Sequence, residues 1–167
     1  MVPLLTRAIG RIMGRRWLLP ALAGAALLLV PAAAAELMSV AVEKANVREG
    51  PGLENPVLWQ AWRFTPFEVL EWSGAWIYIE DFVGDTGWLH QSVLSETPAV
   101  IVAGKYANIR KGPGMDYEVL WTVEREYPLK VLERDGDWLK VSDEEELEGW
   151  IYGKLVWGNK EPEINGL

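Results

Sequence analysis

The residue types that most often carry catalytic or metal chemistry are nearly absent from this sequence. The chain has no cysteine, and His90 is its single histidine. A cysteine nucleophile and a zinc site built from several histidines or cysteines are therefore excluded. Any Ser–His–acid triad would have to use His90. We expect a protein that is not an enzyme and that holds no metal and no cofactor.

An acidic run is the second feature that could do chemistry. It extends from Asp143 to Glu146, with Glu148 nearby. These carboxylates could attract a cation, but they lack the spacing of the oxygen ligands in a calcium loop. Like charges in a run are typical of solvated segments. We therefore expect a solvated hairpin loop here rather than a metal site.

The sequence repeats itself at a fixed distance. The segment Ala45–Gly52 (Ala-Asn-Val-Arg-Glu-Gly-Pro-Gly) returns as Ala107–Gly114 (Ala-Asn-Ile-Arg-Lys-Gly-Pro-Gly), 62 positions later. The same spacing relates Val57-Leu58-Trp59 to Val119-Leu120-Trp121, Gly74 and Trp76 to Gly136 and Trp138, and Gly87-Trp88 to Gly149-Trp150. Self-similarity at one period indicates a duplicated unit.

The repeat also serves as an internal alignment. Residues that both copies share are interpreted as requirements of the fold, and residues that differ as candidates for function. His90 corresponds to Tyr152 in this alignment, which favours a structural histidine over a catalytic one.

The first 35 residues have the pattern of a secretory signal peptide. Four arginines and no acidic residue precede Glu36, and an uncharged stretch covers residues 17–35. Ala33 and Ala35 provide the small residues that signal cleavage requires. We expect residues 1–35 to be removed after Ala35, with cleavage after Ala34 as a close alternative. The sequence leaves the Sec and twin-arginine export routes open.

An uncleaved membrane anchor is the alternative for the same segment. The uncharged stretch of 19 residues is just long enough to span a bilayer. Pro20 and Pro31 count against a continuous helix, so cleavage is favoured. In either case the rest of the chain is expected outside the cytoplasmic membrane, in the periplasm or the extracellular space. Membrane attachment is expected only if the signal segment stays in place.

Export and charge together limit the partners. Residues 36–167 carry 24 acidic and 12 basic side chains, a net charge of −12. Nucleic acid is therefore excluded as a partner, because its binding depends on Lys and Arg neutralising phosphates. Without cysteine there are no disulfides. We therefore expect stability to come from aromatic-rich cores supplied by the nine tryptophans after residue 35.

The repeat divides the chain into a first domain at 38–94, a linker at 95–99, a second domain at 100–156 and a tail at 157–167. Trp76–Glu80 and Trp138–Ser142 alternate with a period of two, which predicts half-buried strands with Ile77, Ile79, Leu139 and Val141 facing inward. A second strand begins at each following Gly-Trp, completing a hairpin. Leu58–Trp62 and Phe67–Leu70, separated by Pro66, predict further strands. We expect an all-β protein with two small β-barrels in tandem after an N-terminal signal helix.

The repeated Asn-Val/Ile-Arg-x-Gly-Pro-Gly motif predicts a tight turn. Glycine supplies positive φ and asparagine bonds nearby backbone in such turns. The arginine could stack on a tryptophan or pair with a glutamate, but a purely structural role in holding the loop is favoured. The motif residues are Asn46, Arg48, Gly50, Pro51 and Gly52 in the first copy, and Asn108, Arg110, Gly112, Pro113 and Gly114 in the second.

The motif, the Gly-x-Trp strands at Gly74 and Gly136, and the closing Gly-Trp-Leu-His and Gly-Trp-Ile-Tyr segments resemble the bacterial SH3 (SH3b) domain family. The resemblance implies small five-stranded β-barrels, twice over nearly the whole chain after the signal. It also implies an accessory module of an exported protein, which is what most known members are. Several members bind the peptide part of peptidoglycan. The proline-peptide groove of eukaryotic relatives is not carried over, because no matching residues are identified here.

The differences between the copies suggest a binding surface. The first copy has Trp62, Phe64, Trp72, Tyr78 and Phe82 where the second has Glu124, Glu126, Arg134, Lys140 and Glu144. Aromatic residues that one copy lacks are not required by the barrel, and exposed apolar patches mark interaction sites. Together with Trp76, which shares a strand face with Tyr78, they are the candidate ligand-binding residues. The equally weighted alternative is that they pack against the second copy, with Trp157 closing that interface.

We therefore expect an exported binding module that recognises a cell-envelope component, with peptidoglycan as the leading ligand. The alternative is an envelope adaptor that binds a separate protein, for which a basic partner surface would suit the charge of −12. A structural duplicate without a ligand is a third class.

Overall fold

The computed structural model describes residues 36–159 of the 167-residue chain. The expected signal segment, residues 1–35, and residues 160–167 of the expected tail lie outside the described residues. Both repeats fall within one compact unit of the described residues. The elements are β-strands and two short 3₁₀ turns, and no helix in the described range is long and apolar enough to span a bilayer.

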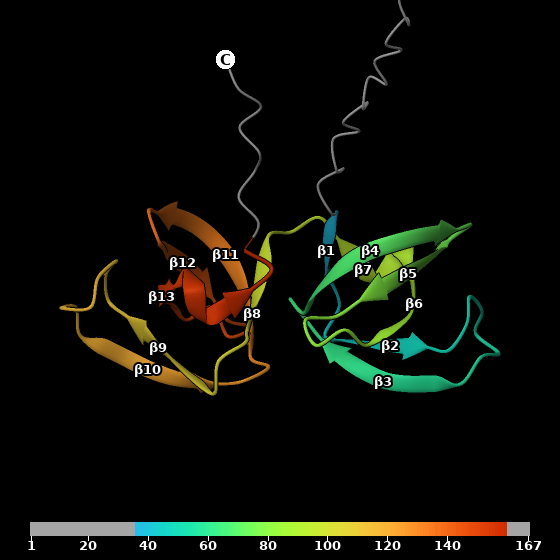
Figure 1. Ribbon diagram of the computed structural model, residues 1–167, viewed down its shortest axis with the longest axis horizontal. Coiled ribbons are helices and arrows are strands. Elements are labelled where there is room, and N and C mark those ends of the chain that lie inside the picture. Colours follow the sequence, from blue (N-terminus) through green and yellow to red (C-terminus); the bar gives the residue numbers. More distant parts are fainter. Residues whose placement is uncertain (1–35, 160–167) are drawn as a thin grey trace, which may run out of the picture. The chain divides into compact units, whose positions relative to one another are not determined.

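The first copy forms one antiparallel sheet with the strand order β3-β2-β6-β5-β4-β1-β7 (Figure 1). Its elements are β1 (Leu37–Val40), β2 (Lys44–Arg48), β3 (Val57–Trp62), β4 (Pro66–Ser73), β5 (Trp76–Glu80), β6 (Thr86–His90), the 3₁₀ turn η1 (Gln91–Val93) and β7 (Leu94–Ser95).

The second copy repeats this topology in the order β10-β9-β13-β12-β11-β8-β14. Its elements are β8 (Ala99–Val102), β9 (Tyr106–Arg110), β10 (Val119–Glu124), β11 (Pro128–Asp135), β12 (Trp138–Ser142), β13 (Glu148–Tyr152), the 3₁₀ turn η2 (Gly153–Leu155) and β14 (Val156–Trp157). The all-β tandem architecture expected from the sequence is confirmed.

Each sheet has seven strands rather than the five that the family resemblance implies. The additional pairing joins the start and the end of each copy, with Ser39 opposite Ser95 in the first copy and Val102 opposite Val156 in the second. These short strands also shift two expected boundaries. Ser95, assigned to the linker, belongs to β7, and Trp157, assigned to the tail, pairs with Ile101 in β14.

Pro66 was expected to lie between two strands. In the structure it is the first residue of β4, which then runs to Ser73. The first position of a strand is one that proline tolerates, since its missing N–H is not needed there. β4 pairs with β5 so that Trp72 lies opposite Ile77 and Ser73 opposite Trp76.

Each barrel has its own core, and both cores are aliphatic rather than aromatic-rich. Ile77, Ile79, Leu139 and Val141 are fully buried, as the strand alternation predicts. None of the nine tryptophans in residues 36–159 is fully buried, and Phe67 is the one aromatic side chain in this range with no exposed surface. The expectation of tryptophan-rich cores is therefore wrong. Inward positions in a barrel this small suit Ile, Val and Leu, while a large indole rarely fits inside completely.

Candidate functional site

The motif arginines fasten the loop that follows β2 and β9. Nη1 of Arg48 donates to the carbonyl oxygens of Leu53 at 3.1 Å and Asn55 at 2.7 Å. In the second copy Nη1 of Arg110 donates to Met115 O at 2.9 Å and Tyr117 O at 2.8 Å. Each guanidinium group thus bonds two carbonyl oxygens of the following loop, which is the arrangement expected if the arginine holds that loop in place.

The motif glycines allow close approach rather than positive φ. The positive-φ glycines in the described range are Gly74, Gly84, Gly136 and Gly158, so the expected left-handed glycines of the motif are not found. A Cβ on Gly50 would instead lie 2.7 Å from Oδ1 of Asn55, and a Cβ on Gly112 would lie 2.5 Å from the Tyr117 ring. The loop folds back so tightly that a side chain at these positions would collide with it.

The motif asparagines also act differently from the expectation. Asn46 and Asn108 lie within strands β2 and β9, with side chains exposed on the outer face. Oδ1 of Asn46 accepts a hydrogen bond from Gln60 at 2.9 Å, and Oδ1 of Asn108 accepts one from Thr122 at 2.8 Å. They bond a side chain on the neighbouring strand rather than turn backbone.

Aromatic rings cover the outer face of the β5–β6 hairpin. The Trp76 and His90 rings meet edge to face with centroids 5.3 Å apart, and the Tyr78 and Trp88 rings lie 5.0 Å apart. The Tyr78 hydroxyl donates to Oγ1 of Thr86 at 2.9 Å. Trp76 and Tyr78 therefore share one face, as expected from the strand alternation.

The equivalent hairpin of the second copy keeps one of these ring pairs. Trp138 and Tyr152 lie 5.4 Å apart, at the positions of Trp76 and His90. The Tyr78–Thr86 hydrogen bond is replaced by an ion pair, with Nζ of Lys140 2.8 Å from Oε2 of Glu148. The hydrogen bond to Glu148, together with the charge of that carboxylate, raises the pKa of the Lys140 ammonium.

A small groove of about 150 Å³ opens beside the Trp138–Tyr152 pair. It is lined by Tyr106, Asn108, Arg110, Met115, Trp138, Tyr152 and Leu155. The same positions of the first copy hold Lys44, Asn46, Arg48, Leu53, Trp76, His90 and Val93. We call the lined space the second-barrel groove and the seven equivalent residues of the first copy the first-barrel groove positions. Each combines a tryptophan, an amide and a guanidinium on one outer face.

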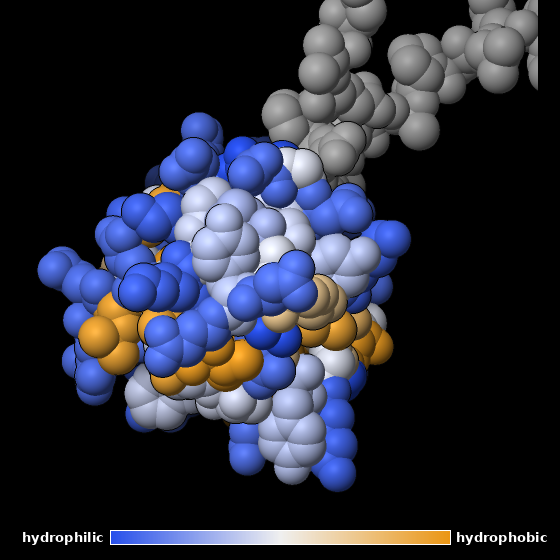
Figure 2. All heavy atoms as spheres, turned by 90° about the vertical axis from the view of Figure 1, so that its left-hand side faces the viewer, coloured by the Kyte–Doolittle hydropathy of each residue, from blue (hydrophilic) through white to orange (hydrophobic). Residues whose placement is uncertain are grey.

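Exposed apolar residues continue from this region onto the edge strand. Met115, Tyr117, Val119 and Leu120 are each more than two-fifths exposed. Figure 2, which faces the second barrel, shows a band of hydrophobic residues crossing an otherwise mostly hydrophilic surface. A bound molecule on this face would therefore meet both polar and apolar groups.

The sequence interpretation missed Tyr106, Met115, Trp138, Tyr152 and Leu155 as candidates, because candidates were sought only among the aromatic residues of the first copy. Strand alternation held the missing signal. In β9 the buried Ala107 and Ile109 alternate with outward-facing Tyr106 and Asn108. A residue at an outward position is a surface residue, whether or not the copies share it.

The six candidate aromatics do not form one patch. Trp76 and Tyr78 lie on the outer hairpin face, whereas Trp72 is paired with Ile77 and so projects to the other face of that hairpin. Phe64 occupies a turn with φ of 65°, matched by Glu126 with φ of 72°. Trp62 and Phe82 lie at the contact with the second barrel.

The two barrels touch through reciprocal contacts. Arg63 of the first barrel pairs with Glu144 of the second, with Nε 3.6 Å from Oε1. Arg125, which corresponds to Arg63, places its guanidinium 4.8 Å from the centre of the Phe82 ring, and Phe82 corresponds to Glu144. Equivalent residues thus contact equivalent positions in the opposite barrel, as in an isologous interface. For Phe82 this placement favours the packing alternative.

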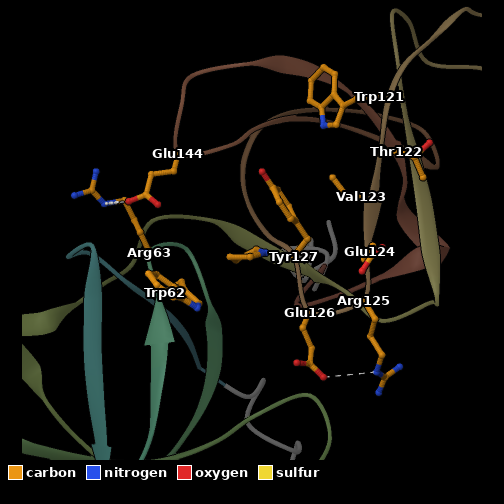
Figure 3. A pocket seen from close by; sticks show the side chains of 11 residues that line it. Trp62, Arg63, Trp121, Thr122, Val123, Glu124, Arg125, Glu126, Tyr127 and Glu144 are labelled. Atoms are coloured by element: carbon orange, nitrogen blue, oxygen red, sulfur yellow. Dashed lines mark ion pairs between the residues drawn. The ribbon is translucent and has the colours of Figure 1, made fainter.

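A cleft of about 680 Å³ lies at this contact, and Figure 3 shows its side chains. Trp62 and Arg63 enter it from the first barrel. The second barrel contributes the segment from Trp121 to Pro128 together with Glu144. Aromatic and charged groups from both copies therefore converge on one space.

The residues that could carry catalysis or bind a cation are used structurally. Nδ1 of His90 lies 2.7 Å from Oγ of Ser92 and accepts from its backbone N–H, which caps η1. Asp143 was expected to be solvated but is buried. Its Oδ1 accepts hydrogen bonds from the backbone N–H groups of Glu145 and Leu147, at 2.9 Å each. Within the described range, no three His, Cys, Asp or Glu side chains are grouped to hold a metal ion.

Comparison with known families identifies the class of protein. Residues 41–96 and 103–158 each match the family described as "Bacterial SH3 domain". The chain belongs to this family, with two tandem copies of its domain. The resemblance drawn from the repeated motif is confirmed.

Individual relatives are more distant. Over 128 residues the chain is 25% identical to a candidate N-acetylmuramoyl-L-alanine amidase, YrvJ of Bacillus subtilis (strain 168), covering 70% of this chain and 24% of YrvJ. The chain thus spans about a quarter of that relative. Among solved structures, NlpC2 of Trichomonas vaginalis is 13% identical with a TM-score of 0.36, covering 80% of this chain and 51% of NlpC2. An NlpC/P60 family protein of Bacillus cereus ATCC 10987 is 15% identical with a TM-score of 0.35, covering 72% of this chain and 55% of that protein.

Proposed function

We propose that this chain is an exported, non-enzymatic binding module that recognises peptidoglycan through the outer faces of its two barrels. The observation that carries the proposal is the second-barrel groove, where a tryptophan lies beside an asparagine and an arginine, with the same three residue types at the first-barrel groove positions. Indole rings stack on sugar and peptide faces, while amide and guanidinium groups supply directed hydrogen bonds. Such a surface suits a ligand made of sugars and short peptides.

Family membership and the relative support the envelope as the place of action. The relative's name describes an amidase of N-acetylmuramoyl-L-alanine, a sugar–peptide unit of peptidoglycan. The aligned 128 residues cover 24% of that protein. The signal-like residues 1–35 fit the same location, periplasmic or extracellular, with membrane attachment only if that segment stays uncleaved. No cofactor or metal is needed for such binding.

The second-barrel groove and the equivalent positions of the first barrel would act together on a polymer. When one barrel is bound, the other is held near neighbouring repeats of the wall, so its effective concentration is high. Weak single contacts can then give useful overall affinity. This would also offset the repulsion between a chain of net charge −12 and anionic wall polymers.

The net charge keeps a second candidate open, an adaptor that binds a basic envelope protein. Charged surfaces mainly accelerate association and are screened by salt. Binding to an envelope protein through charge would therefore decline steeply with salt, whereas stacking on the wall would persist.

Co-sedimentation of residues 36–167 with purified peptidoglycan sacculi, at low and high salt, tests the proposal. We expect binding at both salt concentrations and a loss of about tenfold in affinity when Trp76 and Trp138 are both changed to Ala. Trp72→Ala is the matched control, because Trp72 is exposed on the opposite face of its hairpin. Thermal unfolding of each variant shows that the barrels remain folded. Absence of sedimentation with sacculi at either salt concentration would overturn the proposal.

A further inference from the structure

The cleft between the barrels is a separate ligand-sized space. Its volume of about 680 Å³ lies in the range of small-molecule and peptide sites. It shares no lining residue with the second-barrel groove. In Figure 3, Trp62 from the first barrel and Tyr127 from the second reach into the same space.

Trp62 is an aromatic surface available to a ligand. Half of the residue is exposed, although it lies at the contact between two barrels. Nζ of Lys44 lies 4.0 Å from the centre of its ring, so this indole already accepts an ammonium group. Its counterpart is Glu124, which shows that the barrel does not need an aromatic residue at this position.

The charges around the cleft favour a cation. Both lining arginines have acidic neighbours, Arg63 with Glu144 and Arg125 with Glu126, the latter 3.9 Å apart. The lining also contains Glu124, a third carboxylate against two guanidinium groups. The lining is therefore acidic on balance.

The surroundings of Tyr127 point the same way. Burial and the nearby carboxylates of Asp143, Glu145 and Glu144 raise the pKa of its phenol. Anionic groups therefore surround this ring, and a positive charge beside it would be stabilised.

We propose that the cleft binds a primary ammonium group carried on a short peptide. The ammonium lies between the Trp62 and Tyr127 rings and pairs with Glu124, while the peptide occupies the rest of the cleft. Cation–π contact and a carboxylate partner together provide both affinity and selection by charge. That the peptide comes from the wall rests on the proposed function, whereas recognition of the ammonium does not.

Isothermal titration of residues 36–167 with the synthetic peptide N-acetyl-L-Ala-γ-D-Glu-L-Lys-D-Ala, whose lysine side chain carries its one ammonium group, tests the inference. Its Nε-acetyl-lysine form, which lacks the side-chain positive charge, is the paired probe. We expect acetylation to weaken binding about tenfold, and Trp62→Ala and Glu124→Gln each to weaken binding of the free amine by a similar factor. Trp72→Ala, an exposed tryptophan outside the cleft lining, should leave it unchanged. Equal binding of both peptides, or unchanged binding by Trp62→Ala, would overturn the inference.

Sacculus binding by the same variants separates this inference from the proposed function. Retained sedimentation with sacculi but no preference for the free amine would refute the cleft site alone. Selective binding of the free amine by a protein that does not sediment with sacculi would support the cleft site and refute wall recognition.

Discussion

Changing Gly149 to Ala is expected to lower the free energy of unfolding by about 3 kcal/mol. The new Cβ would lie 2.4 Å from Cγ2 of Ile109 and 3.0 Å from the carbonyl oxygen of Arg110. Ile109 is fully buried in the core and Arg110 O belongs to the strand backbone, so neither can move cheaply. In the first barrel a Cβ on Gly87 would meet Cγ1 of Val47 and the carbonyl oxygen of Arg48. Gly87→Ala should therefore have a similar effect.

Urea unfolding followed by circular dichroism measures this effect as a fall in the midpoint at constant slope. Gly104→Ala is the matched control, because its Cβ would make only ordinary contacts at 3.6 and 3.9 Å. A loss from Gly149→Ala no greater than that from Gly104→Ala would show that β13 does not approach β9 as closely as described.

Replacing Arg110 by Ala is the second large expected effect, a loss of about 2 kcal/mol in unfolding free energy. The substitution removes two charge-assisted hydrogen bonds, to Met115 O and Tyr117 O. We also expect the loop at residues 111–118 to exchange its amide hydrogens faster, because this guanidinium no longer holds it. Since Arg110 lines the second-barrel groove, affinity for sacculi should decrease as well.

Hydrogen exchange and urea unfolding together test this expectation. Lys111→Ala, at the exposed neighbouring position, is the control and should change little. Arg110→Lys should recover only part of the loss, because one ammonium cannot reproduce the geometry of the guanidinium. Protection of the 111–118 amides in Arg110→Ala equal to that in the Lys111 control would contradict the loop-holding role.

The sequence was sufficient to predict the barrels because their signals are local. Alternation over Trp76–Glu80 correctly predicted the buried side of β5, and the repeat correctly predicted a second barrel of the same topology. Pairings between the ends of each copy, such as Ser39 with Ser95, were missed because they join segments far apart in the sequence.

Residue type alone gave two wrong predictions, one for the barrel cores and one for the motif glycines. Tryptophans were expected in the core because a chain without disulfides needs another source of stability, but the inward positions are filled by aliphatic residues such as Ile77. The Gly-Pro-Gly glycines were expected to supply positive φ. Instead, glycine is required at Gly50 and Gly112 because a Cβ there would collide with Asn55 or Tyr117. Both features depend on the space available in the folded barrel, which local pattern does not report.

The candidate site was predicted in part. Comparison of the copies selected Trp62 and Phe82, which lie at the barrel contact, but it passed over Trp138 because both copies have a tryptophan there. The reciprocal contacts of Arg63 and Arg125 depend on how the barrels pack. Neither periodicity nor residue differences could predict that packing.

The indole N–H signals of the tryptophans provide a direct test of wall recognition through the outer faces of the barrels. A ¹⁵N-labelled sample of residues 36–167 would be titrated with soluble sugar–peptide fragments released from sacculi. We expect progressive shifts of the Trp76 and Trp138 indole signals, while the Trp72 signal stays in place. Unchanged Trp76 and Trp138 signals at saturating fragment concentration would contradict wall recognition through these faces.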